Sequence, residues 1–121
     1  MGRLLLAQAL AVSDSLRAAE EEYNQVLAAE PANPRALRGV AYCRIRGGRY
    51  AEAARSYEAA TKAEPGNADG WAGLGNAYLG LSRLDASEEA FRKARAIDPG
   101  NVTMRKGMEL LEKARAASAG G

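Results

Sequence analysis

The chain has 121 residues, of which 47% are hydrophobic and 26% are charged, and its formal net charge is +2. This length fits one domain or a short array of repeats, and so small a net charge predicts neither nucleic-acid binding nor binding to a membrane surface. The sequence contains no histidine and a single cysteine, Cys43, which excludes Ser-His-Asp and Cys-His catalysis, an internal disulfide and nearly every zinc site. We therefore expect no enzymatic activity and no catalytic, cofactor-binding or metal-binding residues.

The N-terminal segment is short and apolar. One basic residue, Arg3, precedes a run from Leu4 to Val12 that resembles the hydrophobic region of a signal peptide, but this run is far too short to span a bilayer. We favour a helix over residues 2–13, because the repeat described next gives the segment that place. A lone cysteine fits a reducing compartment, so the expected location is cytoplasmic. A periplasmic or secreted location is the alternative if residues 1–13 act as a signal segment.

The chain repeats itself every 34 residues, as the spacing of Pro31, Pro65 and Pro99 shows. An asparagine after each proline, an aromatic residue before it and a glycine in the other half of the unit keep the same interval. These residues are Asn33, Asn67, Asn101, Tyr23, Tyr57, Phe91, Gly39, Gly73 and Gly107. A fixed period of this length is typical of a repeat architecture.

Each unit is expected to contain two helices separated by turns. In residues 50–63 the apolar and small residues recur at helical spacing, and the proline and glycine of residues 64–67 then stop the helix. Gly47 and Gly48 separate the two helices of one unit, and Ser82 does so less strongly in the next. In chain order, the predicted helices span residues 2–13, 17–29, 34–46, 50–63, 68–80, 84–97 and 102–117.

These features resemble the tetratricopeptide repeat (TPR) family. The match is clearest over residues 68–101, where family positions are occupied by Trp71, Leu74, Gly75, Tyr78, Phe91, Ala94 and Pro99. Arg44 departs from the family pattern, which has a tyrosine at that position. The resemblance implies an all-α, right-handed superhelical solenoid of three helix-turn-helix pairs plus a C-terminal capping helix. The expected units are a divergent repeat over 1–33, repeats over 34–67 and 68–101, and a capping helix with a tail over 102–121.

The resemblance also implies where a partner binds, because the first helices of the pairs line an inner groove in this family. The expected groove residues are Gln8, Arg35, Arg38, Tyr42, Ile45, Arg46, Asn76, Leu79, Lys106 and Leu110. Arg35, Arg38, Tyr42 and Arg46 lie three or four residues apart on the helix over 34–46, which places them on one face. This face is either a solvated helix surface or a basic groove wall that holds carboxylates. Tyr42 is either a peptide contact or a core residue.

The glycines at one groove-facing position of successive units, Gly39, Gly73 and Gly107, suggest a reason for their recurrence. A glycine inside a helix costs about 1 kcal/mol relative to alanine. One interpretation is that the missing side chain lets a bound backbone approach, and the other is simple duplication of the repeat. The residues predicted to pack without a binding role are Tyr57, Trp71, Leu74, Tyr78 and Phe91. Cys43 is predicted to be a small buried residue rather than a reactive thiol.

The predicted function is a protein-interaction scaffold or adaptor, chaperone-like in holding a protein or peptide ligand in its groove. The ligand is expected to be acidic or carboxylate-bearing, and either extended or helical. We expect no nucleic-acid partner and no membrane insertion. One subset of the family grips a free C-terminal carboxylate at set inner positions. In this chain those positions hold Leu4, Gln8, Gly39, Asp69 and Gly73, or, one repeat later, Arg38, Tyr42, Gly73, Thr103 and Lys106. Neither set reproduces the clamp, so we predict against that mechanism.

Two alternatives to the scaffold stay open. In the first, the apolar residues Leu4, Leu5 and Val12 form an exposed patch through which the chain packs against another copy and forms a homo-oligomer. In the second, the chain is part of a larger protein that contains the same repeats.

Overall fold

The computed structural model describes residues 15–120, and this range contains six α-helices. They are α2 (Leu16–Ala29), α3 (Pro34–Arg46), α4 (Tyr50–Ala63), α5 (Ala68–Gly80), α6 (Leu84–Ile97) and α7 (Val102–Gly120). The predicted helices are confirmed over this range, except that α2 begins one residue earlier and α7 ends three residues later than expected. The helix predicted over residues 2–13 lies outside the described residues.

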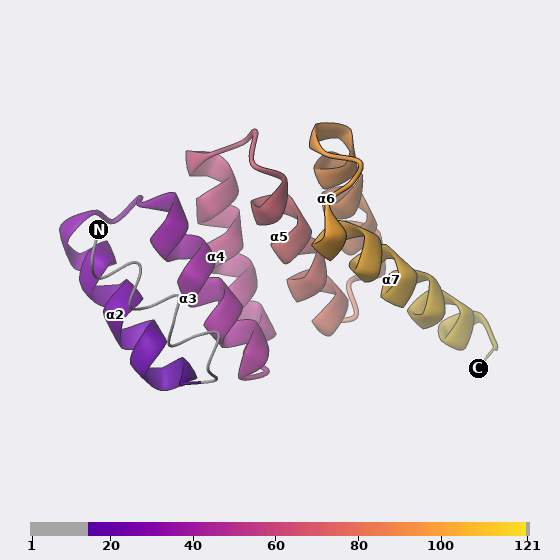
Figure 1. The fold of residues 1–121 in the computed structure, drawn as a ribbon. Coiled ribbons are helices and arrows are strands. Elements are labelled where there is room, and N and C mark those ends of the chain that lie inside the picture. The colour runs from indigo at the N-terminus through magenta and orange to yellow at the C-terminus, as the bar shows by residue number, and fades with distance from the viewer. Residues whose placement is uncertain (1–14, 121) are drawn as a thin grey trace.

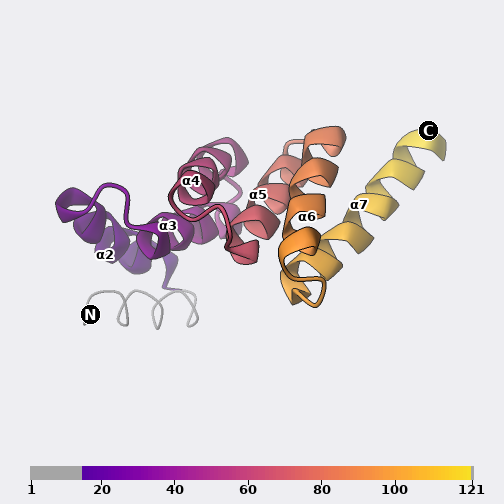
Figure 2. The same ribbon diagram turned by 90° about the horizontal axis from the view of Figure 1, so that it is seen from above.

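The helices follow one another in chain order, from α2 at one end of the molecule to α7 at the other (Figure 1). Each helix contacts the next, and α5 also contacts both α3 and α7. Seen from above, the helical pairs form an open row, and α7 projects past the other helices toward the C-terminus (Figure 2). Within the described part of the chain, α3–α4 and α5–α6 are two complete pairs, and the predicted all-α solenoid is confirmed.

The repeated asparagines are the N-caps of the first helices. Each side-chain Oδ1 accepts a hydrogen bond from a backbone amide two or three residues later, at 3.0, 2.9 and 2.8 Å for Asn33, Asn67 and Asn101. Such a cap satisfies an amide that the helix itself leaves unpaired and stabilises the helix by about 1 kcal/mol. The sequence pattern indicated only that these asparagines recur every 34 residues, two positions after each proline, so their capping role comes from the structure.

The turn inside each complete pair contains one residue in the left-handed backbone region. Gly48 has a φ angle of +77°, and Ser82, at the equivalent position of the next repeat, has a φ angle of +58°. Glycine adopts this conformation readily, whereas a residue with a Cβ pays about 1–2 kcal/mol. The same turn is therefore strained at Ser82 and relaxed at Gly48.

Replacing Ser82 with glycine is expected to raise the free energy of unfolding by about 0.5–1 kcal/mol. Glycine removes the energetic cost of the left-handed backbone from the folded state. The greater entropy of glycine in the unfolded chain offsets only part of this stabilisation. Gly48→Ser is the matched reverse change and is expected to lower the free energy of unfolding by about 1 kcal/mol. No atom lies within 4 Å of the Cβ position at Gly48, so only the backbone angle is tested. Urea denaturation measures both variants, and stabilities equal to that of the parent would contradict the assigned strain.

The repeated aromatic residue of each second helix packs on the repeated glycine of the following first helix. The pairs are Tyr23–Gly39, Tyr57–Gly73 and Phe91–Gly107. A Cβ added at these glycines would lie only 2.2–2.3 Å from the ring, which is far inside van der Waals contact. The glycines therefore make room for an internal aromatic ring, a reason that neither interpretation from sequence included. The approach of a bound backbone stays a prediction for Gly39 and Gly73, which line the groove described below.

The packing predicted for the large residues is confirmed for Tyr57, Leu74 and Phe91, which are 6%, 4% and 0% exposed. Trp71 and Tyr78 are half-buried and pack against the core cluster formed by α3 to α6. Both side chains also form a hydrogen bond. The Trp71 indole N–H donates to a backbone carbonyl at 2.8 Å, and the Tyr78 hydroxyl donates to a glutamate of α4 at 3.1 Å. These two residues are therefore amphipathic packing residues at the boundary of the core.

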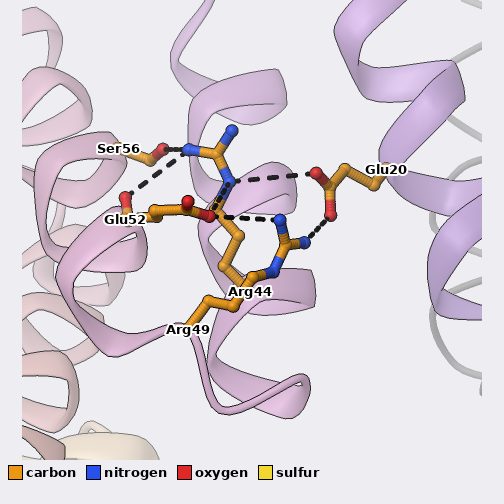
Figure 3. A network of polar contacts seen from close by, with 5 residues as sticks. All are labelled: Glu20, Arg44, Arg49, Glu52 and Ser56. Carbon is orange, nitrogen blue, oxygen red and sulfur yellow. Dashed lines mark hydrogen bonds and ion pairs between the residues drawn. The ribbon is translucent and has the colours of Figure 1, made fainter.

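A polar network replaces the family's tyrosine at Arg44 (Figure 3). The Arg44 Nη1 donates to Ser56 Oγ at 2.7 Å. The Arg44 Nε lies 3.9 Å from the carboxylates of both Glu20 and Glu52, which is close enough for ion pairing but too far for a hydrogen bond. Arg49 pairs with the same two carboxylates. Two arginines and two glutamates thus join α2 to the α3–α4 pair, where the family uses aromatic packing.

Candidate functional site

The described residues form a groove of about 690 Å³ along α3, α5 and the start of α7. Its lining residues are Tyr23, Arg35, Arg38, Gly39, Tyr42, Ile45, Tyr57, Asp69, Gly73, Asn76 and Thr103. The first helices of the pairs supply most of this lining, as the resemblance implied, and the two buried tyrosines come from the second helices α2 and α4. Five predicted groove residues come together in this lining: Arg35, Arg38, Tyr42, Ile45 and Asn76.

The groove wall on α3 combines positive charge with apolar surface. Tyr42 is 40% exposed, so it is a surface residue of the groove and not a core residue. The Arg46 guanidinium donates a hydrogen bond to the Tyr42 hydroxyl at 2.9 Å, and its Cζ lies 5.8 Å from the ring centroid. Ile45 packs partly against the core and presents the rest of its side chain to the groove. This wall offers a ligand an aromatic ring, an aliphatic side chain and adjacent cations.

The groove contains charges of both signs. Arg38 forms an ion pair with Glu64, which lies at the C-terminal end of α4. Asp69, at the beginning of α5, lines the groove and accepts a hydrogen bond from Asn101 Nδ2 at 2.8 Å. The groove therefore presents acceptors as well as cations to a ligand, which a uniformly basic wall would not.

Five arginines lie between Pro31 and Ala51 in the sequence, and they divide between two faces of the molecule. Arg44 and Arg49 belong to the network of Figure 3 and do not line the groove. Arg35 and Arg38 line the groove, and Arg46 lies beside it against Tyr42. The hypothesis of a basic groove wall thus applies to three of the five arginines.

Three predicted groove residues lie away from the groove lining. Leu79 is partly buried against the core cluster formed by α5, α6 and α7, because α7 packs against α5 and covers it. Lys106 and Leu110 are exposed on α7, with Leu110 54% exposed, but neither lines the groove. Thr103, one turn earlier on α7, does line it.

Four residues of the sequence predictions lie outside the described residues. Gln8 was expected in the groove, and Leu4, Leu5 and Val12 were expected to form a patch for self-association. Self-association through that patch therefore stays a prediction.

The sequence analysis missed Tyr23 and Tyr57 as groove residues. Their rings are only 4% and 6% exposed, yet both residues line the groove together with the glycines they pack against. Burial raises the pKa of both phenols above its ordinary value, so both are neutral at physiological pH. The shared period of the aromatic residues and glycines was the available signal, but it does not by itself show that the two sets touch.

The remaining chemistry of the described residues is sparse. Cys43 is 2% exposed, and burial raises the pKa of its thiol, so the predicted burial of this residue is confirmed and its thiol stays protonated. Within residues 15–120, no three or more His, Cys, Asp or Glu side chains group in a way that would hold a metal ion. None of the helices in that range has the length and apolar character needed to cross a membrane.

A second hollow of about 690 Å³ lies against α2. Its lining mixes polar and apolar residues and comes from α2, the end of α3 and the turn that follows. Because this hollow lies at the edge of the described part of the chain, we assign it no function. In the groove along α3, α5 and α7, aromatic, aliphatic and charged side chains converge.

The tetratricopeptide repeat model matches the chain over residues 4–55 and 44–102. None of the curated proteins matches it. Among solved structures, the Sgt2 TPR domain from Aspergillus fumigatus superimposes with a TM-score of 0.90 at 24% identity, covering 99% of this chain and 81% of that one.

Two further similar structures contain a bound partner. The second TPR domain of human RPAP3, in complex with the HSP70 peptide SGPTIEEVD, has a TM-score of 0.83 at 19% identity and covers 91% of this chain and 92% of that one. PcrH, in complex with the chaperone binding region of PopD, has a TM-score of 0.84 at 19% identity and covers 97% of this chain and 91% of that one. At sequence identities this low, these superpositions establish a shared fold and nothing about a shared partner.

Proposed function

Because this chain belongs to the tetratricopeptide repeat family, we propose that it is a protein-interaction scaffold that binds a segment of another protein in the groove along α3, α5 and α7. The observation that carries this proposal is the groove wall in which Tyr42 and Ile45 lie beside Arg35 and Arg38. Aromatic and arginine side chains are the commonest anchors of protein interfaces. The RPAP3 domain with its HSP70 peptide and PcrH with its PopD region support the proposal, since both hold a segment of a partner on the same fold.

The charges of the groove define the chemistry of the partner segment. Arg35 and Arg38, with Arg46 beside them, favour a segment whose acidic side chains face α3, because guanidinium groups hold carboxylates through paired hydrogen bonds. Asp69 on α5 favours a hydrogen-bond donor at the other side of the same segment. A segment with acidic and polar residues around one apolar side chain satisfies both walls.

The proposed ligand is held by its side chains and not by a free C-terminal carboxylate. One subset of the family grips a terminal carboxylate with lysines, asparagines and an arginine at set inner positions, and neither frame of this chain reproduces that set. The first frame has Gly39, Asp69 and Gly73 at three of these positions, and the second has Tyr42, Gly73 and Thr103 beside its two cations. The rings of Tyr23 and Tyr57 already occupy the space beside the two glycines, and a carboxylate at Asp69 repels a second one. A bound peptide is therefore expected to keep its affinity when its C-terminus is amidated, and a large loss on amidation would contradict this part of the proposal.

Charge reversal at Arg35 and Arg38 is expected to weaken peptide binding about tenfold or more. The probe is the tightest-binding peptide selected from a phage-displayed random library against the parent chain, and we expect the selected peptides to be enriched in Asp and Glu. Arg35→Glu/Arg38→Glu replaces attraction by repulsion, and each tenfold change in affinity corresponds to about 1.4 kcal/mol. Raising the salt concentration should weaken binding to the parent and have less effect on the variant, since exposed charges are screened over about 10 Å at 0.1 M.

Two further variants make the result specific to the groove. Arg55→Glu/Arg95→Glu carries the same charge change on exposed residues of α4 and α6 that do not line the groove, and it should bind like the parent. Arg35→Gln/Arg38→Gln, which removes the charges without placing a carboxylate beside Glu64, should give an intermediate loss. Far-UV circular dichroism checks that helicity is kept. Equal affinity of the groove variant, its control and the parent would show that the arginine face is only a solvated surface.

A further inference from the structure

Two tyrosines repeat along the floor of the groove. Tyr23 and Tyr57 are 34 residues apart, and both line the groove. In each pair it is the hydroxyl end of the ring that lies against the glycine. The Cβ position of Gly39 is 2.2 Å from Tyr23 Cζ, and that of Gly73 is 2.3 Å from Tyr57 Cζ and 2.8 Å from its hydroxyl oxygen. Both tyrosines and both glycines line the groove together, so the phenol ends lie at its floor although the side chains are largely buried.

The residue type at this repeat position follows the exposure of the ring. The third member, Phe91, is 0% exposed and does not line the groove, because α7 packs over it through Gly107. A hydroxyl is present at the two positions where the ring reaches the groove and absent at the one where it does not. Packing alone would be served equally well by phenylalanine at all three.

The two hydroxyls have no use inside the described part of the protein. The hydroxyl of Tyr42 accepts from Arg46 at 2.9 Å, and that of Tyr78 donates to Glu58 at 3.1 Å. No such partner is found for Tyr23 or Tyr57 within residues 15–120. Neither hydroxyl is sealed from solvent, since the one enclosed polar side-chain atom without a hydrogen bond in that range is Arg44 Nε. Both hydroxyls are therefore available to hydrogen-bond with solvent or with a ligand in the groove.

The geometry points to Tyr23 and Tyr57 as direct contacts of the bound segment, with each hydroxyl donating a hydrogen bond to a backbone carbonyl of an extended peptide. This inference rests on the proposed function, and it adds the conformation of the ligand, which the sequence left open between extended and helical. A helical peptide uses its carbonyls in its own i to i−4 hydrogen bonds. An extended segment leaves every carbonyl available, so a row of donors along the floor suits the extended form.

The chemistry of the groove fits this role. Burial raises the pKa of both phenols, so each keeps its proton and can donate at neutral pH. A ligand that covered the groove without accepting these bonds would leave two buried donors unsatisfied, which is unfavourable. The arginines select the side chains of the segment, while the tyrosines hold its backbone.

The test uses the full chain with Tyr23→Phe, Tyr57→Phe and both changes together, and the same phage-selected peptide as the probe in isothermal titration calorimetry. Phenylalanine keeps the ring and its packing on the glycine, so the midpoint of thermal unfolding should stay unchanged. Each single variant is expected to bind the peptide about three- to tenfold more weakly, because it loses one hydrogen bond. In the double variant the two fold-losses in affinity should multiply. Tyr78→Phe is the matched control outside the groove and should bind like the parent.

A second arm identifies the acceptor. When the acidic residues of the peptide are replaced by glutamine and asparagine, the loss caused by Tyr57→Phe should persist, because the backbone carbonyl is still present. A loss that vanished with this peptide would assign the hydroxyl to a side-chain carboxylate and overturn the inference.

Other outcomes separate this inference from the proposed function. Suppose that the double tyrosine variant binds the peptide as tightly as the parent does, while Arg35→Glu/Arg38→Glu binds the same peptide more weakly. This result would overturn the inference and leave the scaffold proposal standing. A lowered midpoint of unfolding in Tyr23→Phe or Tyr57→Phe would show an internal hydrogen bond and would also overturn it. Unchanged affinity in both sets of variants would remove the groove as the binding site altogether.

Discussion

Replacing Phe91 with alanine is expected to lower the free energy of unfolding by about 3–5 kcal/mol, as for other large core truncations. Among the residues that the structure describes, Phe91 is the largest fully buried side chain, with 0% of its surface exposed. Its ring lies against Gly75 of α5 and Gly107 of α7, so alanine leaves a cavity where three helices meet. Chemical denaturation followed by circular dichroism measures the loss.

The matched control is Leu110→Ala, which removes a large side chain that is 54% exposed on α7. Surface substitutions of this kind usually change stability by no more than about 0.5 kcal/mol. A loss near zero for Phe91→Ala, or equal losses for the two variants, would contradict the register in which the repeats pack.

Gly107→Ala is expected to destabilise the protein by about 1–2 kcal/mol, although alanine is the better helix former. Helix propensity alone predicts a gain of about 1 kcal/mol. The added Cβ would lie 2.3 Å from the Phe91 ring and 2.8 Å from Asn76 Oδ1, and overpacking a core typically costs about 1–3 kcal/mol. The same edge of the ring also lies against Gly75, whose Cβ position is 2.6 Å from Phe91 Cε1, so the ring is packed against both α5 and α7.

The sign of this change decides between propensity and packing. Gly66→Ala is the control, because no atom lies within 4 Å of the Cβ position at Gly66. The free energy of unfolding of this variant should stay within about 0.5 kcal/mol of that of the parent. Urea denaturation compares the two. A Gly107→Ala variant more stable than the parent would mean that the glycine carries no packing role.

The helices were predictable from the sequence because the signals that bound them are local. Each of Pro31, Pro65 and Pro99 stops a second helix, and the pattern of small and apolar residues between the stops has the helical period. The same local geometry placed Arg35, Arg38 and Tyr42 on one face of α3, and the structure brings them together in the groove. These predictions needed only the dihedral preferences and the 3.6-residue turn of a single helix.

The rest depends on contacts between residues far apart in the chain. Arg38 pairs with Glu64, 26 residues later, and this pairing makes the charge of the groove mixed. Leu79 is covered by α7, which no property of α5 alone reveals. The rings of Tyr23 and Tyr57 reach the groove because they lie against glycines of another helix. The position of their hydroxyls at the groove therefore depends on how successive repeats pack, which the local sequence pattern does not contain.

The most direct test of the groove as the binding site is a nuclear magnetic resonance titration of the isotope-labelled chain with the phage-selected peptide. We expect the largest chemical-shift changes at Tyr42 of α3, Asn76 of α5 and Thr103 of α7, which line the groove together. The indole N–H of Trp71, which donates to the Pro65 carbonyl outside this lining, should show no change and serves as an internal reference. Shifts centred instead on the hollow lined by Trp71, Tyr78 and Lys93, with Tyr42, Asn76 and Thr103 unaffected, would contradict the groove as the binding site.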